Sequence, residues 1–419
     1  MTTPVKRRRF VQTLGTGTVI AGAGCLGGSG DGNGDGNGNG NDDHDHGDHE
    51  NGDDDPEGDA EGSEGLAYAF APNTIAIIDP ETGDVVDEIT DGIDGNEWGD
   101  PQITHDLTQI FVIEGSLNQV LVIDTDSREI VSEVDIGPGA THIYHPNDDE
   151  IWAHADDEGT FYVIDTDSHD VVETVEAGLE GEGHGKLLYH EDFGSMGYAT
   201  NVNDPVAHVI DLGEYDRPDS IELGEDGGTH YKAYAPQNGL AYFEYSDVTA
   251  AVDVDADEVV DELEFSGGMY LTPDEERMGV LDGDEIRFID VTDEENEEIG
   301  SVTVDGGPDA LRYYESDGTL YGFTANTMTP ESVVIDVDEL EEVGRLDAGD
   351  IERPDGAHHL HRSGVSGDEY FFTPAEADGT VAVIDMAERE LIGTVEVEDG
   401  VGTVQYVGDT GTGYTGGIR

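Results

Sequence analysis

A short block of apolar residues recurs eight times along the chain, and each block ends on an aspartate. In one copy, residues 161–175 read FYVIDTDSHDVVETV, an apolar run, a polar turn and a second apolar run. Alternation and β-branched residues predict two strands, and an Asp that can bond nearby backbone predicts the turn between them. The block therefore predicts a β-hairpin. The eight terminal aspartates are Asp79, Asp124, Asp165, Asp211, Asp253, Asp290, Asp336 and Asp385.

The spacing of these blocks predicts the architecture. Successive aspartates lie 37 to 49 residues apart, which is the repeat length of a four-stranded propeller blade. With strands lettered A to D from the axis outward, the third unit is expected at 141–144, 150–154, 160–164 and 171–175. The first unit begins with its B strand at 66–70, and residues 400–407 supply its A strand, which removes an exposed sheet edge. We expect an all-β propeller over 65–419 with eight blades. Seven blades with one irregular unit is the alternative.

Two segments precede the repeats. Residues 1–25 carry Arg8 and Arg9, a short apolar core and AGAGC, a pattern typical of a twin-arginine lipoprotein signal with Cys25 as the lipidated residue. Residues 26–64 are rich in Gly, Asp and Asn and predict a disordered acidic linker. The protein is therefore expected to be exported and lipid-anchored at the outer face of the cytoplasmic membrane.

The charge balance restricts the environment and the partners. The chain has 99 acidic and 16 basic residues, a formal net charge of −83. Repulsion of this size opposes folding in dilute salt, but at 1 M salt the screening length falls to about 3 Å. The composition indicates a halophilic protein. It argues against nucleic-acid binding, which needs Lys and Arg for phosphate contacts.

The first candidate site consists of histidines at nearly equivalent positions near the start of the A strand in four of the units. Four units carry a Gly-rich approach followed by His, in GATHIYHP, GEGHGKLLYH, GGTHYKAYAP and GAHHLHRS. Imidazoles from several blades facing one channel suit Zn²⁺, and Glu182 and Asp355 are candidate carboxylates to orient them. The alternative is that these histidines are polar caps bonded to strand carbonyls. The candidate ligands are His142, His184, His230, His358 and His359.

The remaining histidines fall into three groups. His44, His46 and His49 lie among carboxylates in HDHGDHE and form a candidate secondary zinc site, or simply belong to a solvated acidic linker. At the A–B turns we expect surface roles for His105, His145, His190 and His361. Ordinary exposed or half-buried positions are expected for His154, His169 and His208.

The repeats resemble the YVTN-type β-propeller family, whose blades carry a VSVID pattern followed by Val, as in VLVID, FYVID and VAVID here. HDHGDHE, GEGHG and GAHHLH are together similar to the AztD family of zinc metallochaperones. That resemblance implies an extracytoplasmic protein that delivers zinc to the solute-binding protein of an ABC importer. We expect the protein to be a monomer. It also implies a tight histidine site on the propeller and a weaker site near the N-terminus. A metal-free surface scaffold and, less favoured, a propeller dehydrogenase are the alternatives. We identify no catalytic residue in the sequence.

Overall fold

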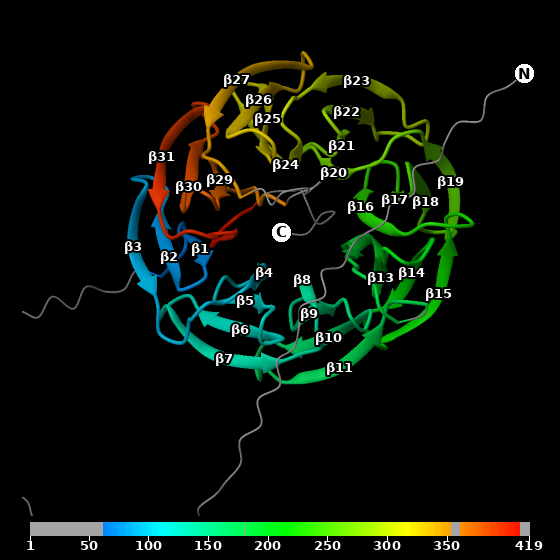
Figure 1. The fold of residues 1–419 in the computed structure, drawn as a ribbon. Coiled ribbons are helices and arrows are strands. Elements are labelled where there is room, and N and C mark those ends of the chain that lie inside the picture. The colour runs from blue at the N-terminus through cyan, green and yellow to red at the C-terminus, as the bar shows by residue number, and fades with distance from the viewer. Residues whose placement is uncertain (1–61, 180, 353–360, 411–419) are drawn as a thin grey trace, which may run out of the picture. The chain divides into compact units, whose positions relative to one another are not determined.

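The computed structural model describes residues 62–179, 181–352 and 361–410. These residues form eight four-stranded antiparallel sheets arranged in a ring as the blades of a propeller (Figure 1). The predicted all-β fold and the count of eight blades are confirmed, and the seven-blade alternative is wrong.

In blades 2 to 8 the strands follow the chain from the axis to the rim, and in blade 1 the innermost strand is β32. Blade 1 contains β1 (Ala67–Ala71), β2 (Thr74–Asp79), β3 (Asp84–Ile89) and β32 (Thr403–Tyr406). Blade 2 contains β4 (Trp98–Ile103), β5 (Gln109–Glu114), β6 (Gln119–Asp124) and β7 (Glu129–Asp135). Blade 3 contains β8 (Ala140–Asn147), β9 (Glu150–Ala155), β10 (Thr160–Asp165) and β11 (Val171–Glu176). Blade 4 contains β12 (Leu187–Tyr189), the 3₁₀ turn η1 (Glu191–Phe193), β13 (Met196–Ala199), β14 (Val206–Asp211) and β15 (Asp216–Glu222).

The second half of the ring repeats this order. Blade 5 contains β16 (Thr229–Ala235), β17 (Leu240–Tyr245), β18 (Val248–Asp253) and β19 (Glu258–Leu263). Blade 6 contains β20 (Gly268–Leu271), β21 (Arg277–Asp282), β22 (Glu285–Asp290) and β23 (Glu298–Thr303). Blade 7 contains β24 (Pro308–Ser316), β25 (Thr319–Asn326), β26 (Glu331–Asp336) and β27 (Glu341–Asp347). Blade 8 contains β28 (Val365–Gly367), β29 (Tyr370–Ala375), β30 (Thr380–Asp385) and β31 (Glu390–Glu396).

The outer C–D hairpin of every blade has the same local construction. Each of the eight predicted aspartates accepts a hydrogen bond from a backbone N–H two or three residues later, as Asp165 does from Ser168 at 2.7 Å. Each C–D pair also has a register shift just before that aspartate, as between Val163 and Ile164. The aspartate fixes the turn and the bulge increases the local twist of the rim strands.

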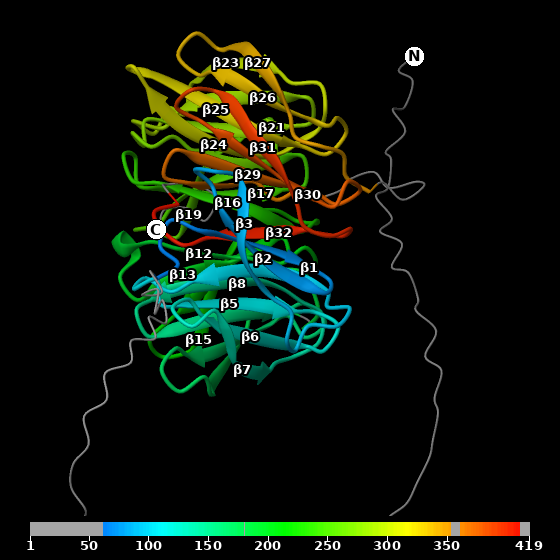
Figure 2. The same ribbon diagram turned by 90° about the vertical axis from the view of Figure 1, so that its left-hand side faces the viewer.

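The ring closes with a strand from the far end of the described chain. β32 pairs antiparallel with β1, with Ala67 opposite Tyr406, and the two lie side by side in Figure 2. The first blade therefore receives its A strand from residues 403–406, as the sequence predicted. Closure of this kind leaves no inner edge strand unpaired.

The apolar core lies between the faces of neighbouring blades. One cluster joins Tyr68 and Phe70 of β1 to Ile110 and Val112 of β5, and the other clusters also span adjacent blades. Because each blade packs on its two neighbours, no single blade has a core of its own. Blade stability therefore depends on the contacts between neighbouring blades.

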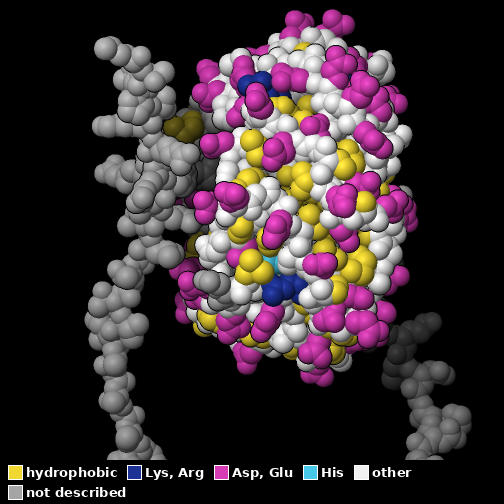
Figure 3. All heavy atoms as spheres, turned by 90° about the vertical axis from the view of Figure 1, so that its right-hand side faces the viewer, with side chains coloured by type: hydrophobic (Ala, Val, Ile, Leu, Met, Phe, Trp, Pro, Cys, Tyr) yellow, Lys and Arg dark blue, Asp and Glu magenta, His cyan; other side chains and the backbone are white. Residues whose placement is uncertain are grey.

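Acidic side chains cover much of the exterior. In Figure 3, Asp and Glu are spread over the drawn face of the propeller, and Lys and Arg are sparse there. The outermost strands expose acidic and small apolar residues together, as β11 does with Val171 and Glu173. No helix within the described residues is long and apolar enough to cross a membrane.

Candidate metal centre

Three histidines from three consecutive blades meet at the channel. His142 lies on β8, His184 in the segment before β12, and His230 on β16. The Nε2 atom of His184 is 3.0 Å from that of His142 and 3.1 Å from that of His230. One ligand atom from each lies within 4.8 Å of the other two, and no other such cluster is found among the described residues.

Irregular backbone at the start of the inner strands aims these side chains. The β8–β9 register shifts between Ala140 and His142, and the β16–β17 register shifts between Thr229 and Lys232, so that His230 falls at the break. Bulges commonly redirect a side chain beside a site.

Glycines allow the His184 segment to approach blade 3 and its own B strand closely. Gly183 has φ +153°, and a Cβ there would lie 1.9 Å from Asn201 Oδ1. A Cβ on Gly185 would lie 2.3 Å from the Thr200 carbonyl oxygen and 3.0 Å from His154 Nε2. A larger residue at either position would push His184 out of the cluster.

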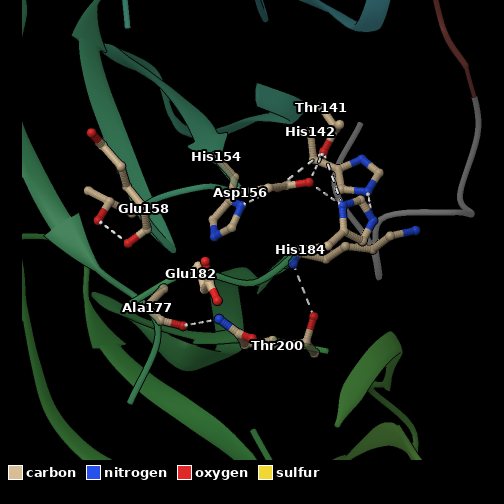
Figure 4. Close-up of polar contacts among 12 residues, drawn as sticks. Thr141, His142, His154, Asp156, Glu158, Ala177, Glu182, His184 and Thr200 are labelled. Carbon is tan, nitrogen blue, oxygen red and sulfur yellow. Dashed lines mark hydrogen bonds and ion pairs between the residues drawn. The ribbon is translucent and has the colours of Figure 1, made fainter. Parts of the chain in front are cut away.

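Carboxylates hold the far nitrogen of two of the three rings. His142 Nδ1 lies 2.6 Å from Asp100 Oδ2, and His184 Nδ1 lies 2.6 Å from Asp156 Oδ2. The other oxygen of Asp156 lies 2.8 Å from Nδ1 of the buried His154, so that this carboxylate points between two rings (Figure 4). His230 Nδ1 faces Glu244 at 3.9 Å.

These partners determine which ring nitrogen is available. A carboxylate only accepts hydrogen bonds, so Nδ1 of His142 and His184 carries the hydrogen and Nε2 of the neutral ring presents a lone pair. Burial opposes ionisation of Asp156, but hydrogen bonds from His154 and His184 outweigh it and lower its pKa to about 2. Burial, reinforced by the Lys186 charge, holds the pKa values of His142 and His230 well below the usual range.

Two of the three nitrogen pairs have nearly the spacing of a tetrahedral metal site, and the third lies within 4.8 Å. Two nitrogens bound to one Zn²⁺ at 2.0–2.1 Å would lie about 3.3 Å apart, close to the observed 3.0 and 3.1 Å. Without a cation, two bare Nε2 atoms at this distance would repel each other. A shared proton could bridge one pair of rings, but burial disfavours the protonated form of His142 and His230. The cluster can therefore hold a metal ion through three Nε2 atoms.

The centre opens into a cavity along the channel. The cavity has a volume of about 410 Å³ and receives residues from all eight blades. His142, His184 and Lys186 line one part, and Asp309, Arg312 and His361 line another. Burial lowers the pKa of Lys186 to about 8 and that of Lys232 to about 7.

Several sequence expectations need correction. Glu182 does not orient a ligand, because its side chain is exposed and the contact to Asn203 uses its backbone carbonyl. Asp100 and Asp156, which sequence reasoning missed, occupy that role. His154, His208 and His145 are fully buried and not exposed or on a surface turn, and His145 stacks on His105 at 3.9 Å between ring centres. The polar-cap alternative also fails for His142 and His184, whose Nδ1 atoms bond carboxylates.

The other candidate residues divide between the undescribed and the described parts of the chain. His358, His359, Asp355, His44, His46, His49 and Cys25 lie outside the described residues. Of the A–B turn histidines, His361 lines the cavity with Nδ1 3.3 Å from Asp309 Oδ2, and His190 caps η1 through its side chain. His169 is half-buried at a turn with φ 58°.

Comparisons with known proteins support the fold. The sequence matches no established family profile and no curated protein. Among solved structures, the chain is similar to the dihydro-heme d1 dehydrogenase NirN in complex with DHE, at 15% identity and a TM-score of 0.67 over 85% of this chain and 78% of that one. It is also similar to AztD from Citrobacter koseri, at 14% identity and a TM-score of 0.58 over 84% and 98% of the two chains. The apo form of that AztD gives 13% identity and a TM-score of 0.56 over 81% and 96%. At these identities the likeness shows the eight-bladed fold alone.

Proposed function

We propose that this propeller is an extracytoplasmic zinc carrier that holds one ion on His142, His184 and His230. The observation that supports it is the convergence of three Nε2 lone pairs, two of them fixed by carboxylates on the opposite nitrogen. Among the described residues the site offers three imidazoles and leaves one tetrahedral position of zinc open, whereas a closed structural site has four protein ligands. Fewer fixed ligands favour a site that can release its ion.

Delivery to a partner is the finer part of this proposal. The sequence motifs shared with the AztD family suggest that the recipient is the solute-binding protein of a zinc ABC importer. The twin-arginine and Cys25 pattern would place the carrier at the outer face of the cytoplasmic membrane, where such a recipient works. A Cys25→Ser variant should then leave the membrane fraction for the medium. If it stays with the membrane, the lipid anchor is wrong.

The metal site is tested by zinc affinity measured against a chromophoric chelator in high salt. His184→Ala should weaken binding at least tenfold, about 1.4 kcal/mol, because the ring contributes one of three ligands. His169→Asn is the matched control, since it removes a histidine at a positive-φ turn that Asn tolerates. Both variants should keep the strand circular dichroism of the parent. Unchanged affinity in His184→Ala would exclude the site.

Delivery is tested separately by mixing zinc-loaded carrier with the zinc-free solute-binding protein encoded by the same organism. Direct transfer should be faster than spontaneous loss of zinc to an excess of chelator. Equal rates would leave zinc binding intact and remove the delivery role.

A further inference from the structure

Both lysines of the propeller are buried beside the candidate metal ligands. The chain has only three lysines, Lys6, Lys186 and Lys232. The last two are 2% and 3% exposed and each follows a candidate metal ligand by two residues, in His184-Gly-Lys and His230-Tyr-Lys. Lysine is almost never buried so completely without compensating charge. Both lysines interact with neighbouring groups. Their deep burial beside a site for a divalent cation is nevertheless unusual for lysine.

Ring contacts place these lysines next to the histidines. Lys186 Nζ lies 4.9 Å from the centre of the Tyr231 ring, which contacts the His230 ring at 4.4 Å. Lys232 Nζ lies 5.7 Å from the Tyr144 ring, which is 6.4 Å from the His142 ring. Each lysine is thus separated from a histidine ring by one tyrosine ring. We call Lys186, Lys232, Tyr144 and Tyr231 the lysine layer.

The adjoining cavity is unusually rich in cations for this chain. Acidic residues outnumber basic ones 99 to 16 overall, but the cavity is lined by three of each: Lys186, Arg312, Arg362, Asp100, Asp309 and Glu376. Arg362 has a structural role, because it donates to Thr373 Oγ1 and to the carbonyl oxygens of Asn326 and Ala348. Arg312 lies over the Tyr270 ring at 5.3 Å.

The cavity lining leaves out Lys232 and the carboxylates of Asp156 and Glu244 beside the histidines. With them the site has five acidic and four basic side chains, so a bound divalent ion would leave it with a net positive charge. Charge removed from water needs a counter-charge close by. Within the described residues, the three histidines leave the fourth tetrahedral position without a protein ligand. A bound carboxylate would supply both the counter-charge and the fourth ligand. One of its oxygens can bind the metal while Lys and Arg pair with the remaining negative charge.

We propose that the channel cavity binds a small organic mono- or dicarboxylate together with the metal ion, with a carboxylate oxygen at the fourth coordination position and Lys186 and Arg312 as its cationic partners. This inference rests on the proposed metal site. A cavity of about 410 Å³ has room for a carboxylate of a few carbons beside the ion. The carrier would then hold its metal as a ternary complex.

The test uses the full chain loaded with Co²⁺ at constant multimolar KCl, with visible absorption reporting the cobalt coordination. Acetate and succinate should each produce a saturable spectral change, and acetamide, the neutral analogue of acetate, should not. Lys186→Met and Arg312→Met should each raise the half-saturating carboxylate concentration at least tenfold. Arg389→Met is the matched control, because Arg389 also lies over a tyrosine ring, at 4.5 Å from Tyr321, and does not line the cavity.

The outcomes separate this inference from the proposed function. Cobalt that binds tightly with no response to carboxylate overturns the inference and leaves the metal site standing. A response that is equal in the parent, Lys186→Met and Arg312→Met also overturns it, because the anion then binds without the lysine layer and Arg312. Failure of the parent to bind cobalt or zinc at all removes both. Two independent substitutions keep the test decisive if one variant fails to fold.

Discussion

The C–D hairpins at the rim and the inner strands at the channel are both repeated eight times, but only the hairpins are uniform. All eight carry the turn aspartate and the register shift before it. The inner strands differ from blade to blade. Four of them have a register shift near their start, and a different residue lies at or beside each shift: Asp100, His142, His230 and Asp309. The inner strand β20 of blade 6 has no such shift and carries Met269. The uniform hairpin positions determine the fold of the blade, and the variable positions of the inner strands provide the side chains of the candidate metal centre.

The two regions also differ in charge. The rim exposes acidic side chains to solvent, whereas the channel collects histidines, both of the propeller's lysines and carboxylates in fixed contacts. Changes of solvent should therefore act on the rim, and single substitutions in the channel should act on metal binding. The following predictions test that division.

The largest expected effect is that of salt on the rim. Dilution from multimolar KCl to about 0.1 M lengthens the screening range to about 10 Å and leaves the acidic residues repelling one another. We expect a loss of several kcal/mol, a large part of the roughly 5–15 kcal/mol that stabilises a typical domain. Thermal unfolding followed by circular dichroism measures it.

NaCl at the same ionic strength is the control for this experiment, because it screens charge as KCl does. It should restore the stability lost on dilution to the same extent. Identical unfolding temperatures at both salt concentrations would show that the acidic rim is not what limits stability.

The second effect is a loss of stability in acid caused by His145, whose side chain is buried on the inner strand β8. Burial lowers its pKa to about 4, although the backbone contact at Glu150 and the charges of Asp148 and Asp106 favour the proton and His105 disfavours it. The unfolded chain, with an ordinary pKa near 6.5, binds more protons in this range, so stability falls as pH drops from about 6.5 to about 4. The loss attributable to this group is about 3 kcal/mol.

His145→Asn measures that loss, because an amide can donate to the Glu150 carbonyl oxygen but does not titrate. Denaturant unfolding from pH 8 to 4.5 should show a shallower decline in the variant. The buried His208, whose pKa burial also lowers to about 4, will still contribute to the slope in both proteins. Parallel curves for variant and parent would contradict the role of His145.

The sequence predicted the rim hairpins more completely than it predicted the residues of the channel. Hairpins, blade number and closure by residues 403–406 were predictable because alternation and Asp turns are local signals. His142, His184 and His230 were found because a glycine-rich approach precedes each. Asp100 and Asp156 were missed because single acidic residues are uninformative in a chain with 99 of them. The two lysines, so rare here, were the signal that sequence reasoning overlooked.

A third prediction compares two aspartates, one in each region. Asp156→Asn should weaken zinc binding by about 10- to 100-fold, because an amide cannot accept hydrogen bonds from both His184 and His154 as the carboxylate does. Asp165→Asn should leave zinc affinity unchanged, since Asn Oδ1 can still accept from Ser168 at the rim turn. Calorimetric titration of both variants decides the matter. Equal affinity in the two would mean that Asp156 does not support the metal ligands.

The smallest expected effect on the channel comes from the N-terminal histidines, which lie outside the described residues. The sequence predicts a segment without fixed structure, so any zinc it binds must offset an ordering cost and is held more weakly than at a preformed site. Replacing His44, His46 and His49 with Asn should remove a weak zinc equivalent and change the affinity of the tight site less than twofold. The same triple variant should also load more slowly when zinc is scarce, as stopped-flow mixing with a zinc-sensitive dye can measure. Two zinc equivalents of unaltered affinity in the variant would show that this segment takes no part in metal binding.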